Sequence, residues 1–301
     1  MAVPGAAPAC AAGREPDGIA WIQPQSLETL WFHTGTACNL DCPFCLEGAR
    51  PGDTRLQRLN LADVQPLVEA ALALDVRRFC FTGGEPFVVK DMVAILDHAA
   101  AFRPCLVLTN GTAAVVRRLT QIRKLIGTAH PVSFRVSLDH ADEARHDADR
   151  GAGNFRLALQ GLRSLHKLGF AVSVARQMQP GRDEREVDQD FRELFAREGL
   201  PVDLPVVSYP DYGLPGTQRE VPALTTECLR ERQAEDIRRT FMCASSKMVV
   251  KQAGRMRIYA CALVDDDPRF DQGSSLEEAL QPRILLQHHR CHSCVRYGRR
   301  L

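Results

Sequence analysis

Three cysteines lie close together in the stretch HTGTACNLDCPFCLEG, at positions 33–48. Cys38, Cys42 and Cys45 have the spacing C-x3-C-x2-C, and three thiols cannot all pair with one another in disulfides. Three thiolates leave one position open on a tetrahedral zinc ion, and likewise leave one iron free on a [4Fe–4S] cluster. The spacing therefore predicts a metal or cluster site. A zinc site completed by His33 or by a distant cysteine remains an alternative.

A glycine-rich turn follows the second apolar run of the sequence. The run at 77–82 leads directly into Gly83, Gly84, Glu85 and Pro86. Two glycines let the backbone approach a ligand closely, glutamate offers an anionic acceptor, and proline fixes the exit of the chain. The position of this turn, one strand and one helix after the cysteine loop, favours a site that the two loops share.

Four more cysteines lie in the C-terminal part of the sequence, with the spacings C-x17-C and C-x2-C. They are Cys243, Cys261, Cys291 and Cys294. The segment 248–260 predicts a hairpin of two apolar strands around QAGR. The two spacings indicate a four-thiolate site, which could hold zinc or an iron–sulfur cluster. Nearby histidines are competing ligands, namely His288, His289 and His292.

The elements that must position these groups follow a regular order. Short apolar runs predict six buried strands, at 30–34, 77–82, 105–110, 132–138, 170–176 and 203–208. Helical patterns lie between them, at 62–74, 91–101, 112–125, 154–168 and 184–198. This alternation predicts consecutive βαβ units, a parallel sheet and right-handed crossovers. We expect a partial (β/α)6 parallel barrel over residues 29–210, with reacting groups at the C-terminal ends of its strands; an open doubly wound sheet is the alternative.

The two ends of the sequence depart from this pattern. Residues 1–28 are rich in Ala, Pro and Gly and predict an N-terminal arm or lid. Residues 209–222 hold three prolines and two glycines and predict a linker. A helical stretch at 224–240 then precedes the C-terminal cysteines. We therefore expect a separate small α+β domain over residues 211–301.

The composition is that of an ordinary globular protein and restricts the partners to be expected. The 38 basic and 37 acidic residues of the 301-residue chain nearly cancel, so charge favours neither nucleic acid nor an anionic membrane as a partner. No apolar run has the length of a membrane-spanning helix, and we expect no secretory signal. A cytoplasmic protein with reduced thiols is expected, so its eleven cysteines need an explanation other than disulfides. Cys80 and Cys105 lie inside predicted strands and are expected in the core.

The cysteine loop and the glycine-rich turn together resemble the radical S-adenosylmethionine (SAM) enzymes. The motif C-x3-C-x-aromatic-C of that family matches Cys38, Cys42, Phe44 and Cys45, and its glycine-rich motif matches residues 83–86. The resemblance covers roughly residues 30–208. It implies that the three cysteines hold a [4Fe–4S] cluster whose fourth iron is chelated by SAM.

The same resemblance implies a set of contacts with SAM. They are Phe44, Gly83, Gly84, Glu85, Pro86, Thr109, Asn110, Ser137, Asp139 and Arg176. Phe44 would cover the adenine, Glu85 would meet the amino group of SAM, and Arg176 would pair with its carboxylate. Ser137 and Asp139 would contact the ribose or the carboxylate. The Asn-Gly pair at 110–111 is also typical of a simple turn.

The C-terminal cysteines resemble the shortened auxiliary-cluster domain, or twitch domain, of some radical SAM enzymes. That domain holds one extra [4Fe–4S] cluster, whereas the longer SPASM domain holds two and needs more cysteines. The resemblance implies a second cluster held by Cys243, Cys261, Cys291 and Cys294, which would accept an electron from the substrate radical. A structural zinc module in the same place remains an alternative.

The expected function is that of a radical SAM oxidoreductase. The enzyme would cleave SAM reductively to a 5′-deoxyadenosyl radical, abstract a hydrogen atom from a small metabolite or natural-product precursor, and pass an electron to the auxiliary cluster. A radical SAM peptide maturase that forms thioether or carbon–carbon crosslinks is an alternative, and a non-catalytic zinc-binding protein is an alternative of another class. The expected partners are a small-molecule or short-peptide substrate and a reducing electron donor such as flavodoxin or ferredoxin.

Overall fold

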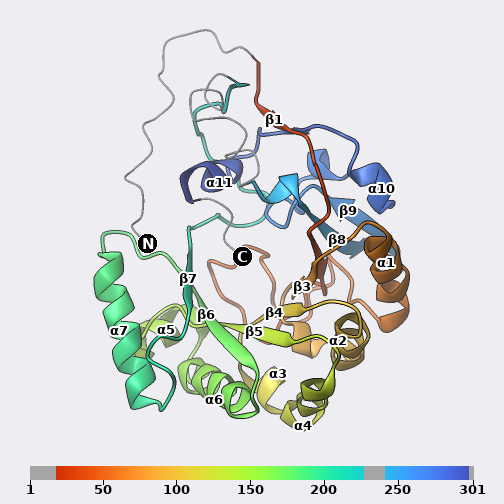
Figure 1. Cartoon of the computed structure of the whole chain (residues 1–301). Coiled ribbons are helices and arrows are strands. Elements are labelled where there is room, and N and C mark those ends of the chain that lie inside the picture. Colours follow the sequence, from red (N-terminus) through yellow and green to blue (C-terminus); the bar gives the residue numbers. More distant parts are fainter. Residues whose placement is uncertain (1–17, 227–240, 298–301) are drawn as a thin grey trace.

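The computed structural model describes residues 18–226 and 241–297 of the chain. All six strands expected from the sequence are present: β2 (Thr29–His33), β3 (Arg78–Thr82), β4 (Cys105–Thr109), β5 (Val132–Ser137), β6 (Ala171–Gln177) and β7 (Val206–Tyr209). Each strand pairs in parallel with the next, in the order β7-β6-β5-β4-β3-β2 (Figure 1). The predicted mixed α/β fold with a parallel sheet is therefore confirmed.

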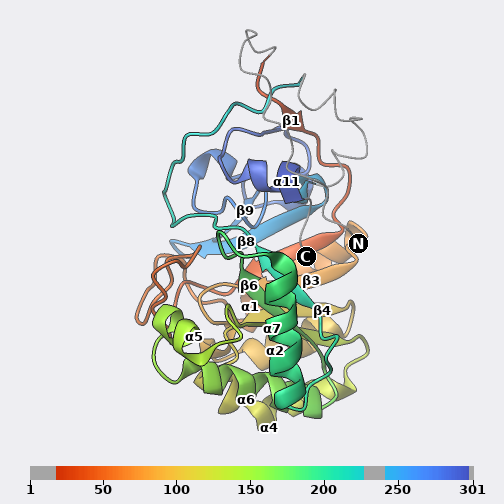
Figure 2. The same cartoon turned by 90° about the vertical axis from the view of Figure 1, so that its left-hand side faces the viewer.

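Four of the five expected helices are continuous: α1 (Leu61–Ala73), α2 (Met92–Ala100), α6 (Asn154–Lys167) and α7 (Glu184–Arg197). Asn60 begins α1 with a capping box, because its side chain accepts from the Asp63 amide at 3.0 Å and Asp63 accepts from the Asn60 amide at 2.9 Å. In both views the helices lie on the outer side of the strands (Figures 1 and 2).

The helical pattern expected over 112–125 is present, but it is divided into three short helices. That segment forms α3 (Ala113–Val116), α4 (Leu119–Ile122) and the 3-10 helix η2 (Arg123–Gly127). Val115, Val116 and Thr120 are β-branched, which lowers the helix propensity of this stretch. A further helix, α5 (Glu143–Arg150), was not expected from the apolar pattern. Asp142 caps it by accepting a hydrogen bond from the Arg145 amide at 2.9 Å.

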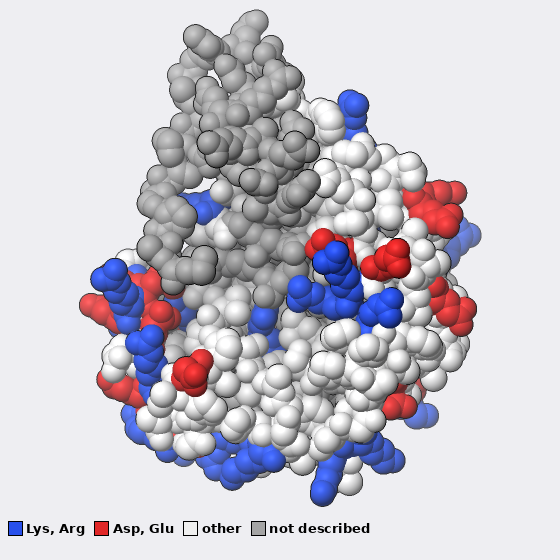
Figure 3. All heavy atoms as spheres, in the orientation of Figure 1, with Lys and Arg blue, Asp and Glu red and all other residues white. Residues whose placement is uncertain are grey.

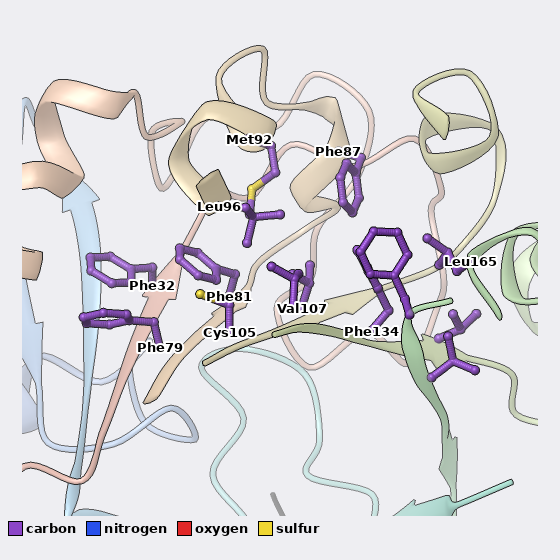
Figure 4. Packing of buried hydrophobic residues seen from close by; sticks show 14 of the residues in the cluster. Phe32, Phe79, Phe81, Phe87, Met92, Leu96, Cys105, Val107, Phe134 and Leu165 are labelled. Atoms are coloured by element: carbon purple, nitrogen blue, oxygen red, sulfur yellow. The ribbon is translucent and has the colours of Figure 1, made fainter. Parts of the chain in front are cut away.

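Alternate residues of the central strands face opposite sides of the sheet. Phe32, Phe81 and Cys105 pack in a core beneath the helices, where the Phe32 and Phe81 rings stack 5.3 Å apart (Figure 4). Trp31 and Cys80 belong to a second core, which lies between the sheet and the C-terminal segment. The expected burial of Cys80 and Cys105 is confirmed, and each belongs to a different core.

The C-terminal segment continues the same sheet. The expected hairpin is present as β8 (Ser246–Gln252) and β9 (Arg255–Tyr259), and β8 pairs in parallel with β2. The described residues thus form an eight-stranded sheet with β7 and β9 at its edges, and this sheet crosses the boundary expected near residue 211. The remaining elements are η1 (Pro86–Val88), η3 (Met242–Ala244), η4 (Pro268–Phe270), α10 (Leu276–Ala279), β10 (Ile284–Leu285) and α11 (Cys291–Tyr297).

The described part of the expected N-terminal arm is packed against the C-terminal segment. The strand β1 (Trp21–Ile22) pairs antiparallel with β10, and Ala20 and Leu27 are buried. In both views β1 lies beside the C-terminal segment, coloured blue (Figures 1 and 2). Residues 1–17 of the arm and residues 227–240, which hold most of the helix expected at 224–240, lie outside the described residues.

Charges of both signs occur over the face of the molecule shown in Figure 3, as the near-zero net charge leads one to expect. Among the described residues, no helix combines the length and the apolar composition needed to cross a membrane.

Candidate functional site

A pocket opens at the C-terminal ends of the parallel strands, where the reacting groups were expected. Most of the expected site residues line it: Cys38, Cys42, Phe44, Cys45, Gly83, Gly84, Thr109, Asn110, Ser137, Asp139 and Arg176. Glu85 and Pro86 are buried behind this lining. The loops after β2, β3, β4, β5 and β6 therefore converge on one site, because parallel strands end at the same edge of the sheet.

Short-range hydrogen bonds hold the cysteine loop in a series of turns. The Cys45 amide donates to the Cys42 carbonyl at 3.1 Å, and the Gly48 amide donates to the Cys45 carbonyl at 2.8 Å. The three thiols are partly buried, and burial raises the pKa of Cys38 to about 12 and that of Cys42 to about 11. Thiolates at these positions thus need a positive partner, which a metal or a cluster supplies.

The glycine-rich turn lies directly against the cysteine loop. The Gly84 amide donates to the Gly35 carbonyl at 2.8 Å, and the Glu85 amide donates to the Ala37 carbonyl at 3.0 Å. A Cβ at position 84 would lie 2.3 Å from the Ala37 carbonyl oxygen, which no side chain can occupy. The glycine is therefore required for contact between the two loops, in addition to any contact with a ligand.

Glu85 is fully buried and its carboxylate is used within the protein. One oxygen accepts from the Phe87 amide at 3.0 Å and from Thr109 Oγ1 at 2.8 Å. The other accepts from the Asn110 amide at 2.8 Å. Glu85 thereby connects the loop after β3 to the loop after β4, and the expected contact of its carboxylate with SAM stays a prediction.

Arg150, at the end of α5, is a site residue that the sequence analysis missed. It lines the pocket, its Nε lies 2.5 Å from Asp139 Oδ2, and its guanidinium carbon lies 5.4 Å from the centre of the Phe44 ring. Burial opposes ionisation of Asp139, but Arg150 and the Gln177 amide outweigh it and hold the pKa of Asp139 below its usual range. Arg150 lies in the stretch HDADRGAGNF at 146–155, which the sequence analysis did not assign to the site.

Arg176 extends from β6 to the wall of the pocket with 1% of its surface exposed. Its Nη2 pairs with Glu184, and its Nε is buried without a hydrogen-bond partner among the described residues. A buried guanidinium donor without an acceptor is costly, and an anionic oxygen from a ligand would satisfy it. This orphaned donor fits the expected pairing with the carboxylate of SAM.

The tertiary structure brings the four C-terminal cysteines together. Cys243 lies in η3, Cys261 follows β9, and Cys291 and Cys294 lie in α11. Burial raises the pKa of Cys243 and of Cys261 well above the usual range, and the neighbouring thiols of the group add to the effect. Such a buried set of mutually repelling thiolates is typical of ligands to a metal or a cluster.

Two basic side chains support this second group. Lys247 is fully buried, and its Nζ donates to Gln272 Oε1 at 2.6 Å. Burial lowers the pKa of Lys247 to about 8, while the Cys243 and Cys261 thiols oppose that change. Arg290 lies directly before Cys291 and donates to the Leu263 carbonyl at 2.9 Å and to Asp266 at 2.9 Å. These long-range contacts could not be expected from local sequence patterns.

Two of the three histidines considered as competing ligands each use one ring nitrogen in another contact, while His289 Nδ1 is buried without a hydrogen-bond partner among the described residues. His289 Nε2 lies 3.0 Å from the Tyr212 carbonyl, and His288 Nδ1 accepts from the Arg290 amide at 3.1 Å. His33 is buried at the end of β2, where its Nδ1 accepts from the Gly35 amide at 3.1 Å. Its Nε2 therefore carries the proton and donates to Glu47 at 2.9 Å. In this tautomer His33 has no lone pair with which to complete a zinc site.

A zinc ion and a [4Fe–4S] cluster hold their cysteine sulfur atoms at different spacings. Four thiolates on a single zinc ion are held about 3.8 Å apart, because each zinc–sulfur bond is about 2.3 Å and the geometry is tetrahedral. Within the described residues, no three sulfur atoms of either cysteine group lie within 4.8 Å of one another. In a [4Fe–4S] cluster each cysteine binds a different iron, so wider spacing is expected. Both donor sets therefore offer the thiolates that a cluster requires, without the close spacing of a zinc site already formed.

The cysteine loop and residues next to two of the C-terminal cysteines line the same pocket. Met242, Ala262 and Leu263 line it, and they are chain neighbours of Cys243 and Cys261. The loop of Cys38 to Cys45 lines it as well. A ligand in this pocket would therefore lie against the cysteine loop and against residues that adjoin Cys243 and Cys261 in the chain.

Comparison with known proteins identifies relatives over the parallel sheet. The model of the radical SAM superfamily matches residues 32–194. The mycofactocin maturase MftC of Mycolicibacterium smegmatis is 31% identical over 171 residues, which are 54% of this chain and 40% of that protein. A probable GTP 3′,8-cyclase of Aeropyrum pernix is 32% identical over 177 residues, which are 56% of this chain and 47% of that protein. The matches thus span less than half the length of these two relatives.

Solved structures share the fold over most of the chain. SuiB of Streptococcus suis bound to S-adenosylmethionine has a TM-score of 0.61 at 12% identity, covering 90% of this chain and 68% of that one. Native anSMEcpe with bound AdoMet has a TM-score of 0.60 at 12% identity, covering 88% of this chain and 82% of that one. At such low identity these likenesses show the fold alone.

Proposed function

Because this chain belongs to the radical SAM superfamily, whose members use a [4Fe–4S] cluster and SAM, we propose that it cleaves SAM reductively and oxidises a substrate in the pocket. Cys38, Cys42 and Cys45 are assigned as the ligands of the SAM-binding cluster. Residues 29–210 are assigned to a partial (β/α)6 barrel, and residues 211–301 to an auxiliary-cluster domain of the twitch type. A donor such as flavodoxin or ferredoxin would supply the electron.

The chain's own residues would bind and orient the reactants. When bound, the clusters and SAM supply one-electron cleavage, hydrogen-atom abstraction and an acceptor for the electron that remains on the substrate. Gly83 and Gly84 leave the backbone open to a ligand. Arg176 offers its unpartnered Nε to a carboxylate. Phe44 presents an aromatic face to the pocket. The Arg150 guanidinium contacts that ring and pairs with Asp139.

One observation carries the proposal of net oxidation: the pocket that the cysteine loop lines is also lined by Met242 and Ala262, the chain neighbours of Cys243 and Cys261. A substrate that has lost a hydrogen atom keeps an unpaired electron, and net oxidation requires that this electron leave. The Cys243, Cys261, Cys291 and Cys294 group lies beside the pocket, and its thiols are buried or nearly so. We assign it to a second [4Fe–4S] cluster with this role.

For the substrate we propose a peptide. The match to a maturase at 31% identity supports this class, and the pocket offers apolar side chains such as Leu40, Leu108 and Leu263 to a peptide side chain. A small metabolite is the second candidate, because the match to a probable GTP 3′,8-cyclase has similar identity. The chemistry of the two cysteine groups is the same in either case.

Iron and acid-labile sulfide per chain test the cluster assignments. After anaerobic reconstitution, the wild-type chain is expected to hold about eight irons, and a Cys38/Cys42/Cys45→Ala variant about four. If the wild type holds about four irons and the variant none, the C-terminal group is not a cluster, and the electron-acceptor role fails. If the variant keeps the full iron content, the assignment of the SAM-binding cluster fails.

A further inference from the structure

A second cavity lies at the opposite end of the sheet from the pocket described above. Its lining includes Arg78 and Cys105, which begin β3 and β4, and Ala171, which begins β6. Pro205, directly before β7, closes one side. The cavity is therefore formed by the N-terminal ends of the parallel strands, and neither cysteine group borders it.

All of the charged residues that line this cavity are basic. Arg77, Arg78 and Arg135 line it, together with Ser133 and Ser173, and its lining includes no carboxylate. Among the described residues, no carboxylate forms an ion pair with any of these three arginines. Three uncompensated guanidinium groups around one hollow attract an anion.

Arg135 gives the strongest indication, because 8% of its surface is exposed. Its Nε donates to Ser173 Oγ at 3.2 Å and its Nη1 donates to the Tyr209 hydroxyl at 2.8 Å. Both partners are neutral. Buried arginines are normally paired with an anion, since removing a full charge from water is costly. Arg135 is thus a buried cation whose counter-ion is missing from the described residues.

The charges of Arg78 and Arg135 both affect the Cys80 thiol. Burial raises the pKa of Cys80 to about 12, and the charges of Arg78 and Arg135 oppose that rise. Cys80 lies on the inner face of β3, so both guanidinium groups lie near that face. Ser173 accepts from Arg135 through its oxygen, which leaves its hydroxyl proton available to an anion.

We propose that this cavity binds an oxyanion, which is the phosphate or carboxylate group of a small molecule. Arginine forks match the planar edge of a carboxylate and the tetrahedral face of a phosphate, and hydrogen bonds between charged groups are about twice as strong as neutral ones. The bound group would supply the counter-ion that Arg135 lacks. The two cavities share no lining residue, although Arg135 contacts Tyr209 of the first pocket, and the proposal stands or falls independently of the proposed function.

Isothermal titration calorimetry of the reconstituted full-length chain tests this proposal. Inorganic phosphate and succinate are titrated separately at constant ionic strength, with sodium chloride as the matched salt. The variants are Arg135→Gln and Arg78→Gln, and Arg163→Gln is the control, because Arg163 lies on α6 and pairs with Glu198. Visible absorbance of the clusters and circular dichroism establish that each variant is folded.

We expect one saturable site in the wild type, at least tenfold weaker binding in Arg135→Gln and Arg78→Gln, and unchanged binding in Arg163→Gln. Preference for phosphate would identify a phosphate-bearing ligand, and preference for succinate a carboxylate. If Arg135→Gln fails to fold, Arg78→Gln decides the result. Absence of saturable binding of either anion to the wild type, or wild-type binding in the folded arginine variants, would overturn the proposal.

Discussion

The two cysteine groups are assembled in different ways. Cys38, Cys42 and Cys45 share one loop whose turns are closed by hydrogen bonds within that loop. Cys243 and Cys294 come from separate segments, which meet because β8 pairs with β2 and α11 packs over the hairpin core. A local motif is therefore enough to build the first group, whereas the second exists only in the folded chain.

The groups also differ in exposure. The thiols of the cysteine loop are partly exposed to the pocket, whereas Cys243, Cys261 and Cys294 are 6–7% exposed. Basic side chains lie near both groups: Arg150 near the loop, and Lys247 and Arg290 near the C-terminal group. An accessible group suits a cluster that must bind SAM, and a buried group suits a cluster that exchanges only electrons. The following predictions test this division of roles.

The largest effect is expected for Cys45→Ala. Loss of one of three ligands should remove the SAM-binding cluster and abolish formation of 5′-deoxyadenosine, measured by chromatography after reduction. Cys80→Ala is the matched control, because it removes a buried thiol that belongs to neither group. Continued 5′-deoxyadenosine formation by folded Cys45→Ala would refute the assignment of the loop.

Cys294→Ala should separate the two groups. We expect it to lose up to about four of about eight irons and to abolish substrate conversion, while SAM cleavage stays within about twofold of wild type. Ser293→Ala is the control in the same helix, where its hydroxyl donates to the Arg290 carbonyl. Unchanged conversion in Cys294→Ala would end the electron-acceptor role of the second group.

Arg150→Gln tests the role of Arg150, the residue near the cysteine loop that the sequence analysis missed. It leaves Asp139 without its charged partner and removes the cation over Phe44, so the KM for SAM should rise roughly tenfold, as a desolvated cation–π contact of about 1–2 kcal/mol implies. Arg156→Gln is the control, because that side chain is exposed and pairs with Glu143. An equal change in both variants would show that Arg150 has no specific role.

Gly84→Ala tests the contact between the two loops. The added Cβ would lie 2.3 Å from the Ala37 carbonyl oxygen, so the backbone must move, and we expect a loss of about 1–3 kcal/mol in the free energy of unfolding by urea. Gly127→Ala is the control, because a Cβ there meets no atom within 4 Å. Equal stability of the two variants would show that the loops do not require this close approach.

Asp53→Asn should have the smallest effect of these substitutions. It should lower the stability of the fold by an amount that depends on pH. Burial opposes ionisation of Asp53, but hydrogen bonds from Arg55 and Thr36 outweigh it and lower its pKa to about 2. Because the folded pKa is below the ordinary value of 3.8, the stabilisation is present above that pH and is lost as the pH falls toward 2. The variant should be about 1 kcal/mol less stable than wild type at pH 7. A difference in thermal unfolding that is as large at pH 2 as at pH 7 would contradict this account.

The sequence by itself determined the parallel sheet and the loop that carries the first cysteine group. Apolar runs alternating with helical patterns predicted six strands, and the ends of those strands predicted the place of the pocket. These features could be predicted because strand burial, turn formation and ligand spacing depend on residues that are close in the chain. The resemblance of Cys38 to Cys45 and of the glycine-rich turn to one family added the cofactor.

The tertiary structure alone decided which distant groups meet. It directed the carboxylate of Glu85 into the protein, brought Arg150 to Phe44 and Asp139, and left Arg135 buried with neutral partners. The C-terminal hairpin was expected in a separate domain, but the tertiary structure joins it to the parallel sheet. No local pattern encodes such contacts, because they depend on how whole strands and helices pack and on which charges remain unpaired once they do.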